Sequence, residues 1–294
     1  MARVGATCAV LLSLSACAGV ARVGEAPGTP TILFLSDFGT QDGAVAVCKG
    51  VMWQITPSLR IVDLSHDIPP YDIHTAAEVL EQAMPFYGRG TVAVAVVDPG
   101  VGGARRNIAV LTRTGKFLVG PDNGIFALVL AAEGLDRAVE LRNTRWQRMP
   151  DPSYTFHGRD IFSPVAAHLA AGVPLDSLGP QIQPALLDIR PAVRTGDAIA
   201  GVVRYVETPF GNVVTNITPA LLAEAGIRVG DTLDVRIGVR SARLPWARTF
   251  SDVPLGQPLA VLHSRALLSF SVNQGNFAES FGVSRGDSVR VSRR

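Results

Sequence analysis

Apolar residues along the chain follow two different patterns, one before and one after about residue 195. In the first part, short apolar runs alternate with stretches whose apolar residues recur at helical spacing. The run TVAVAVV at 91–97 is typical of a strand buried on both faces. We therefore expect a three-layer α/β domain with a mostly parallel sheet over residues 31–195. Its strands are predicted at 31–36, 60–64, 91–97, 107–111 and 116–119, and its helices at 45–55, 73–86 and 159–171.

The second part, residues 196–294, shows short apolar runs separated by close turns. Pro180, Pro184 and Pro191 mark the joint before it, and only residues 219–225 offer a short helix. This pattern predicts a smaller antiparallel β-domain. Two domains favour a ligand site between them or between subunits. The strands are expected at 198–206, 212–217, 232–237, 258–262, 267–272 and 288–291.

The first residues form a separate feature. Arg3 precedes an apolar stretch that is too short to span a bilayer, and the stretch ends in the letters LSAC at Cys17. These letters resemble the lipobox of bacterial lipoprotein signals, in which the cysteine sulfur carries the lipid. We expect a signal peptide over 1–17, a tether at 18–30, and an exported protein anchored to the membrane through Cys17. The alternative is an apolar extension or a start codon placed too early, which would leave the protein in the cytoplasm.

Composition narrows the class of protein without giving its activity. The chain has 294 residues, of which 47% are hydrophobic and 18% are charged, and its formal net charge is +2. Since basic residues form no long block and are not interleaved with aromatic ones, no nucleic-acid partner is expected. In the lipidated form Cys48 would carry the free thiol, so neither an intramolecular disulfide nor a Cys-x-x-Cys metal site is expected.

Three polar, glycine-bearing segments follow the ends of predicted strands or open a predicted helix, at 36–43, 98–106 and 156–160. In open α/β sheets, ligands bind beyond the carboxyl ends of the strands. The residues that we expect at one cleft are Asp37, Asp42, Asp98, Arg105 and His157.

Each of these residues also has a structural interpretation. Asp42 and Asp160 are equally compatible with capping a helix, and Asp98 with forming an ordinary turn. A histidine such as His157, taken alone, is more often structural than catalytic. The glycines at 100, 102 and 103 lack both a Walker-type lysine and the full dinucleotide-binding spacing. The pattern alone therefore indicates an α/β enzyme with an acid–arginine–histidine cleft and no more.

Seven blocks of sequence, in order along residues 31–292, carry a resemblance to a known family. They are SDFGTQDGAVAVCKGVM, IVDLSHDIPPYDIHTAA, VAVVDPGVGGARRNIAV, GPDNGIFALV, TFHGRDIFSPVAAHLA, FGNVVTNI and SVNQGNFAESFGV. The chain resembles the S-adenosyl-L-methionine hydroxide adenosyltransferase family, which is related to enzymes that fluorinate or chlorinate the same substrate. The resemblance implies an α/β domain followed by a C-terminal β-barrel. It also implies a homotrimer, with the substrate bound between neighbouring subunits.

The resemblance further implies a reaction. Asp98, Arg105 and His157 match the triad of the hydroxide-using members, whereas the halogenating relatives carry other residues at the positions of Asp98 and His157. The triad would orient a water for in-line attack on the ribose C5′ of S-adenosyl-L-methionine, giving adenosine and L-methionine. No metal and no cofactor are expected.

Substrate contacts are implied with the same warrant. Asp37 matches the acid that holds both ribose hydroxyls, and Asp42 the acid that faces the methionine end. The other matching positions, from both domains, are Tyr71, Phe156, Asn212, Phe250, Ser264 and Arg265. Phe250 would stack on adenine, although an aromatic core residue is an equal alternative.

Two features keep other functions open. The segment Glu207-Thr208-Pro209-Phe210-Gly211-Asn212 departs from the Asp-x-Phe-Gly-Asn motif of the hydrolases, and Glu207 would then hold the methionine amino group differently. This segment, which is one residue longer than the hydrolase motif, is together with Ser264-Arg265 closer to the halogenating branch, so a halide-dependent adenosyl transferase is an alternative. Because S-adenosyl-L-methionine is a cytoplasmic metabolite, an exported lipoprotein that binds an adenosyl ligand without turnover is another.

Overall fold

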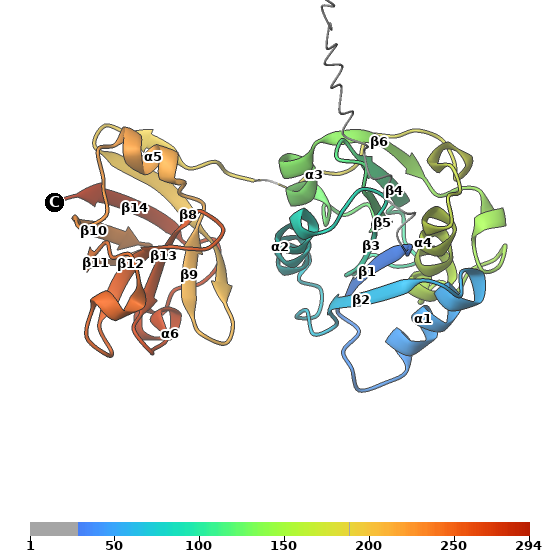
Figure 1. Ribbon diagram of the computed structural model, residues 1–294, viewed down its shortest axis with the longest axis horizontal. Helices are drawn as coiled ribbons and strands as arrows, with labels where there is room; N and C mark the ends of the chain where they lie inside the picture. Colours follow the sequence, from blue (N-terminus) through green and yellow to red (C-terminus); the bar gives the residue numbers. More distant parts are fainter. Residues whose placement is uncertain (1–28, 188) are drawn as a thin grey trace, which may run out of the picture.

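The computed structural model describes residues 29–187 and 189–294. The expected signal segment and the lipidation position Cys17 lie outside the described residues. Figure 1 shows an α/β part, coloured blue to green, beside a β-rich part, coloured yellow to red. No helix among the described residues is long and apolar enough to cross a membrane.

The α/β part is built on a six-stranded sheet with the order β2-β1-β3-β5-β4-β6. Strands β2, β1, β3 and β5 pair in parallel, whereas β4 runs antiparallel to both β5 and β6. The hairpin between β4 and β5 turns at Gly115, whose φ of 84° favours glycine. The strands are β1 (Thr31–Ser36), β2 (Arg60–Ser65), β3 (Val92–Val96), β4 (Asn107–Thr112), β5 (Phe117–Pro121) and β6 (Leu135–Glu140).

Helices cover both faces of this sheet, as the continuous apolar strands predict. Ile32 and Phe34 of β1 share a core with Met52 of the first helix, while Leu33 packs on the opposite face with Leu80 of the second. Helices α1 (Ala44–Ile55) and α4 (Ser163–Ala170) pack together on the first face, and α2 (Ile73–Ala83) and α3 (Ala127–Glu133) pack together on the second. The three-layer α/β prediction is therefore confirmed.

Two predicted helices differ locally from the structure. The predicted helix at 73–86 ends as an α-helix at Ala83 and continues as a 3-10 turn, Met84–Phe86, around Pro85. The predicted helix at 159–171 begins with a π-helical turn, Gly158–Phe162, before α4. Two further short 3-10 turns are Thr144–Trp146 and Leu175–Ser177.

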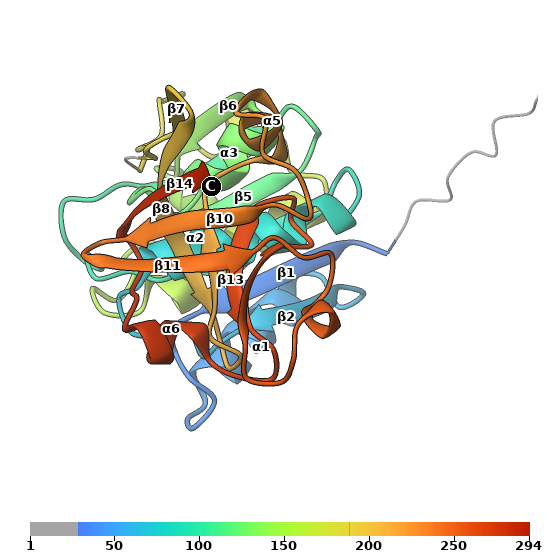
Figure 2. The ribbon, with the colours of Figure 1, turned by 90° about the vertical axis from the view of Figure 1, so that its left-hand side faces the viewer.

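The second part is an antiparallel barrel, seen facing the viewer in Figure 2. The long strand β8 pairs with β14 along its first half and with β9 along its second. A bridge between Trp246 and Ala260 brings the end of β11 beside β12, which nearly closes the barrel. Its strands are β7 (Val193–Thr195), β8 (Ala198–Glu207), β9 (Asn212–Thr215), β10 (Thr232–Ile237), β11 (Arg240–Pro245), β12 (Pro258–Leu262), β13 (Leu268–Val272) and β14 (Ser288–Arg293).

The predicted helix at 219–225 is present as α5 (Pro219–Glu224), with Thr218 accepting the backbone N–H of Leu221. The expectation that this part contains only one helix is wrong, because α6 (Phe277–Phe281) is also present. A helix of five residues is too short to produce a recognisable hydrophobic period. A 3-10 turn, Phe250–Asp252, lies between β11 and β12.

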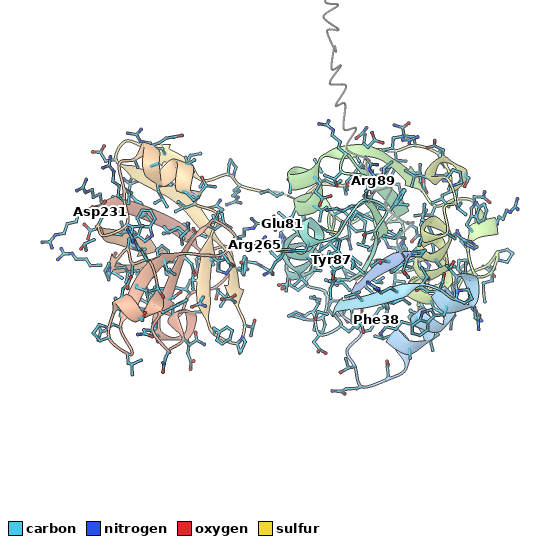
Figure 3. All side chains as sticks on the ribbon, in the orientation of Figure 1. Phe38, Glu81, Tyr87, Arg89, Asp231 and Arg265 are labelled. Atoms are coloured by element: carbon cyan, nitrogen blue, oxygen red, sulfur yellow. The ribbon has the colours of Figure 1, made fainter. Side chains whose placement is uncertain are left out.

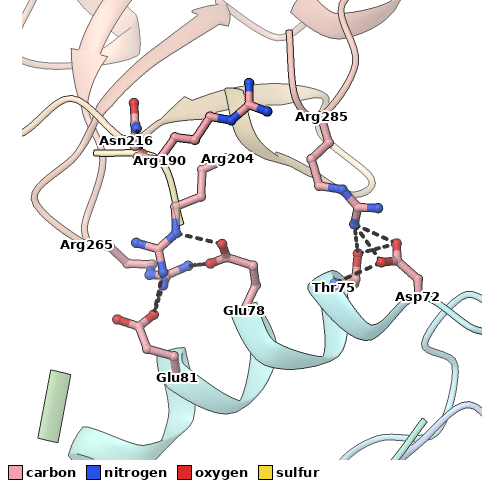
Figure 4. A network of polar contacts seen from close by, with 9 residues as sticks. All are labelled: Asp72, Thr75, Glu78, Glu81, Arg190, Arg204, Asn216, Arg265 and Arg285. Carbon is pink, nitrogen blue, oxygen red and sulfur yellow. Dashed lines mark hydrogen bonds and ion pairs between the residues drawn. The ribbon is translucent and has the colours of Figure 1, made fainter. Parts of the chain in front are cut away.

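Ion pairs join the barrel to helix α2, and Glu81 and Arg265 are labelled where the two parts meet in Figure 3. Glu78 accepts from Arg204 Nε at 2.6 Å and from Arg265 Nη1 at 3.0 Å. Glu81 pairs with Arg265 and lies 3.3 Å from Arg204 Nη2. Two carboxylates of one helix therefore bind two barrel arginines (Figure 4).

A second contact joins the barrel to the beginning of α2. Asp72 caps this helix by accepting the N–H of Thr75 at 3.1 Å, and Arg285 Nη1 donates to both Asp72 oxygens at 2.6 and 2.8 Å (Figure 4). Burial by itself would raise the pKa of Asp72, but the Thr75 and Arg285 contacts outweigh it and lower that pKa.

Candidate active site

Asp98 and Arg105 form a closed ion pair at the carboxyl end of β3. Arg105 Nε donates to Asp98 Oδ1 at 2.8 Å and Nη2 donates to Oδ2, which is the bidentate geometry of a guanidinium on a carboxylate. The two side chains are only 6% and 11% exposed. Two glycines allow the intervening loop to fold tightly: Gly102 has a φ of 73°, and a Cβ on Gly100 would lie 3.0 Å from the Arg105 side chain.

His157 contacts the same guanidinium from the turn before α4. Its Nδ1 lies 2.8 Å from Arg105 Nη2 and 3.2 Å from Asn107 Oδ1, and Asn107 Oδ1 also accepts Arg105 Nη1. The structure thus brings the three residues of the expected triad together and adds Asn107. Sequence reasoning missed Asn107 because it is the first residue of a predicted strand.

The contacts of Nδ1 fix where the imidazole proton lies. Arginine has only donors, so the 2.8 Å contact requires a lone pair on Nδ1, whereas the longer contact to Asn107 would require a proton there. Burial, and then the charge of Arg105, lower the pKa of His157, which also favours the neutral ring. We assign the proton to Nε2, which leaves an N–H donor on the far side of the ring.

The segment 36–43 contacts the turn around His157 through Phe38. Asp37 follows β1 directly, and its Oδ2 accepts the backbone N–H of Tyr71 at 3.0 Å. Tyr71 is largely exposed and has a φ of 68°. Asp42 Oδ1 accepts the N–H of Ala44, the first residue of α1, at 2.9 Å, whereas the N-cap position itself is occupied by Gly43 without a side-chain cap hydrogen bond.

Aromatic contacts connect this segment to the histidine turn. The rings of Phe38 and Phe156 meet edge to face with centroids 5.7 Å apart. A Cβ on Gly158 would lie 2.9 Å from the Phe38 ring, so the turn after His157 approaches that ring closely. Asp160 is buried and binds Arg159, which gives it a structural role beneath the turn. A hollow of about 470 Å³ beside Phe38 also includes Asp42 and Asp67.

The barrel contains a larger cavity of about 1000 Å³. Four residues that the sequence analysis selected line it: Glu207, Asn212, Phe250 and Ser264. Glu207 Oε2 accepts Asn212 Nδ2 at 2.7 Å. Phe250 is 42% exposed at this cavity, which excludes the aromatic-core alternative.

Other residues of the barrel cavity differ from the expectation. The Arg265 guanidinium binds Glu78 and Glu81 of α2 and is not among the groups that line the cavity. His263 lines it instead, with Nε2 3.5 Å from Glu207 Oε1 and Nδ1 accepting the N–H of Arg265. His263 was missed because a histidine directly before Ser264-Arg265 matches no recognised motif.

Among the described residues, the expected catalytic side chains lie apart from the barrel cavity. None of Asp98, Arg105 and His157 lines the barrel cavity. Across residues 29–187 and 189–294, no group of three or more histidine, cysteine, aspartate or glutamate side chains is placed to hold a metal ion. Cys48 is buried, and desolvation raises the pKa of its thiol to about 11, so it is a poor nucleophile.

Comparison with known proteins covers both parts of the chain. The family models for the SAM hydroxide adenosyltransferase N-terminal and C-terminal domains match residues 32–179 and 201–290. A protein of Salinispora arenicola named (R)-S-adenosyl-L-methionine hydrolase is 42% identical over 90% of this chain and 98% of its own. A Thermus thermophilus protein of the same name is 41% identical over 88% and 98%. A fluorinase of an Actinoplanes species is 31% identical over 91% and 99%.

Solved structures agree with these relatives. The crystal structure of a conserved protein from Thermotoga maritima superposes with a TM-score of 0.85, is 36% identical, and covers 89% of this chain and 100% of that one. A Thermus thermophilus structure has a TM-score of 0.72 at 40% identity, over 89% and 99%. With both domain models matched in order and relatives of over 40% identity along nearly their whole length, the chain belongs to the SAM hydroxide adenosyltransferase family.

Proposed function

We propose that this protein hydrolyses S-adenosyl-L-methionine to adenosine and L-methionine, with Asp98, Arg105 and His157 as catalytic residues. The observation that carries the proposal is the closed cluster of these three side chains with Asn107. The family and the hydrolase relatives at 41–42% identity support the same reaction.

The reaction needs a positioned nucleophile more than it needs acid catalysis. The water oxygen forms a bond to C5′ while the C5′–sulfur bond breaks. The electron pair of the breaking C5′–sulfur bond goes to sulfur, and methionine leaves as a neutral thioether. One proton leaves the attacking water, so the sulfonium charge ends as a released proton. Because the sulfonium is already a good leaving group, the protein gains rate by holding water in line and by stabilising developing hydroxide.

Each member of the cluster has a distinct role in this scheme. The Asp98 carboxylate, which Arg105 holds in place, accepts a hydrogen bond from the water. This hydrogen bond orients one lone pair of the water oxygen toward C5′. The Arg105 guanidinium supplies positive charge where hydroxide character develops. Neutral His157 donates from Nε2 and fixes the water from a second direction.

The name of the hydrolase relatives specifies the (R) form of the substrate. We propose the same preference here. A sulfonium is pyramidal, so its two forms place the methyl group on opposite sides of the line of attack. Measuring the turnover of the separated (R) and (S) forms tests this preference. Equal kcat/KM values for the two forms would refute it.

We further propose that the site is completed by the barrel of a neighbouring copy in a homotrimer. The support is that the barrel cavity, with Glu207, Asn212, Phe250 and Ser264, is not lined by the catalytic cluster of the same chain. Co-expression of Asp98→Ala and Asn212→Ala chains, both impaired alone, should restore about a quarter of the sites by random assortment. No restoration would assign both halves to one chain.

Localisation is a separate proposal, made from the LSAC letters that end at Cys17. We propose that the protein is exported and anchored to the membrane by a lipid on that cysteine. The protein is then expected in the membrane fraction, with lipid attached to it. If the Cys17→Ala variant still fractionates with membranes, the proposed lipid anchor is refuted.

The direct test of function is incubation of residues 31–294 with S-adenosyl-L-methionine in heavy-oxygen water, with and without halide. Adenosine labelled at its 5′ oxygen supports attack by water. A 5′-halo-5′-deoxyadenosine would move the chain to the halide-dependent alternative, for which the fluorinase relatives are the support. Tight binding with no product would favour the exported binding lipoprotein.

A further inference from the structure

Four polar side chains form a connected set at the carboxyl end of β1, next to the segment 36–43 that carries Asp37. Ser36 Oγ lies 2.7 Å from His66 Nδ1, and both side chains are buried. His66 Nε2 lies 3.1 Å from Asp63 Oδ1, which is an ion-pair distance although the N–H is not aligned for a hydrogen bond. Lys49 Nζ donates to the other Asp63 oxygen at 2.5 Å. The set therefore links helix α1, strand β2 and the end of β1.

The electrostatics of this set favour one arrangement of protons. Burial would raise the pKa of Asp63, but the contacts with Lys49 and His66 outweigh it and lower that pKa, so Asp63 is a carboxylate. A carboxylate facing Nε2 favours the proton there. Nδ1 then accepts the Ser36 hydroxyl, and the Ser36 oxygen keeps its lone pairs for the loop above.

The residue types match a serine hydrolase triad, but the geometry does not. In such triads the serine contacts Nε2 and the acid contacts Nδ1, whereas here the two ring nitrogens have the opposite partners. Ser36 is also 0% exposed, so its oxygen cannot reach a substrate. The set has to act through what it holds in place.

What it holds is the loop that carries Asp37. The carbonyl of His66 accepts the N–H of Gly39 at 2.8 Å, and Ser36 Oγ accepts the N–H of Phe38 at 3.4 Å. Asp37 lies between these anchors, next to Ser36 in sequence, with its Oδ2 bound to the N–H of Tyr71. His66 thus fixes the backbone on both sides of Asp37, once through its side chain and once through its main chain.

We propose that His66 is a positioning residue that acts through Ser36 to aim the Asp37 carboxylate at the 2′- and 3′-hydroxyls of the substrate ribose. The proposal rests on the function proposed above, because it takes an adenosyl nucleoside as the ligand. A carboxylate grips two neighbouring hydroxyls only if both oxygens face them, so small rotations of the loop weaken that contact selectively.

The test is a cycle between protein variants and ribose hydroxyls. The kcat/KM of the wild type is measured with S-adenosyl-L-methionine and with its 2′,3′-dideoxy analogue, and the same pair is measured for His66→Ala. Losing hydrogen bonds to a charged group should cost the wild type about 10- to 100-fold or more. In His66→Ala, removal of the hydroxyls should cost less than about 3-fold, because the contact is already lost.

Matched variants separate positioning from general damage. His66→Gln offers an acceptor for Ser36 and a donor for Asp63, so it should recover part of the discrimination. Ser36→Ala removes one oxygen and should reduce discrimination even if His66→Ala fails to fold. His168→Gln alters a half-buried histidine that contacts Trp146 and should leave the discrimination unchanged.

Unchanged discrimination in both His66→Ala and Ser36→Ala would overturn the proposal, whatever happens to total activity. Failure of the proposed function has a different signature, which is a wild type that turns over neither substrate. The same cycle is then measured as calorimetric binding of adenosine and 2′,3′-dideoxyadenosine. Equal penalties in wild type and variants, or no binding by the wild type, would again overturn the role of His66.

Discussion

Asn107 provides the sharpest test of the proposed catalytic cluster, because its side chain contacts two of the proposed catalytic residues without belonging to the expected triad. Its Oδ1 accepts Arg105 Nη1 and lies 3.2 Å from His157 Nδ1. The substitution Asn107→Ala removes this oxygen while the residue keeps its backbone place in β4. Arg105 then retains Asp98 and His157 as partners but loses the contact that fixes the plane of its guanidinium.

The size of the effect follows from what is left unpaired. A hydrogen bond to a charged group contributes about 1.5–3 kcal/mol, and Arg105 is too buried for water to replace it freely. If this loss falls on the placement of the attacking water, kcat should decrease about 10- to 150-fold. Because Asn107 makes no expected contact with the substrate, KM should change less than about 3-fold.

The assay is steady-state formation of adenosine, with the thermal midpoint measured in parallel to confirm folding. Asn107→Asp is the matched variant, since it keeps an acceptor for Arg105 but adds a negative charge beside His157. That charge should raise the pKa of His157 and move the acid limb of kcat to higher pH. An Asn107→Ala enzyme with kcat within about 2-fold of the wild type, or with its whole loss in KM, would refute the reasoning.

Three further predictions concern pH, the junction of the two parts and the barrel cavity. Burial and the charge of Arg105 lower the pKa of His157, so the neutral ring should persist at neutral pH, and the acid limb of kcat should lie below the ordinary pKa range of histidine and be absent in His157→Gln. Glu78→Gln should lower the free energy of urea unfolding by about 1–3 kcal/mol, because it leaves barrel arginines with one acid fewer. Asp176→Asn, in an ion pair where both side chains are largely exposed, should lower it by less than about 0.5 kcal/mol. Phe250→Ala should raise KM about 2- to 10-fold with little change in kcat. An unchanged KM would refute the proposed contact between Phe250 and the substrate.

The strands of the α/β part could be predicted because burial on both faces leaves an almost unbroken apolar run. Val92–Val96 is buried at every position, and β1 is buried at all but its first residue. Residues 127–140 escaped prediction, because a seven-residue helix and an edge strand meet at Gly134 without a polar turn. Neither element is long enough to establish its own period.

The site divides in the same way between local and distant information. The order of acids, glycines and the histidine suggested a cleft, and family resemblance selected Asp98, Arg105 and His157 from it. The Arg265 guanidinium is positioned by Glu78, which is 187 residues away in sequence and belongs to the other part of the chain. No local pattern can reveal such a pairing, because long-range contacts are set by the packing of whole elements.

Helix α2 connects these distant contacts to the segment 36–43, which carries Asp37. Its first turn is capped by Asp72, which binds the barrel through Arg285 and directly follows Tyr71, whose N–H holds Asp37. Further along the same helix, Glu78 binds two arginines of the barrel. The contact with the barrel and the position of Asp37, the acid proposed to bind the ribose, therefore depend on the same short helix. Substitutions that weaken the ion pairs between α2 and the barrel should therefore shift Asp37 through the helix cap at Asp72. The Asp98–Arg105 pair, which lies in the loop between β3 and β4, should keep its geometry.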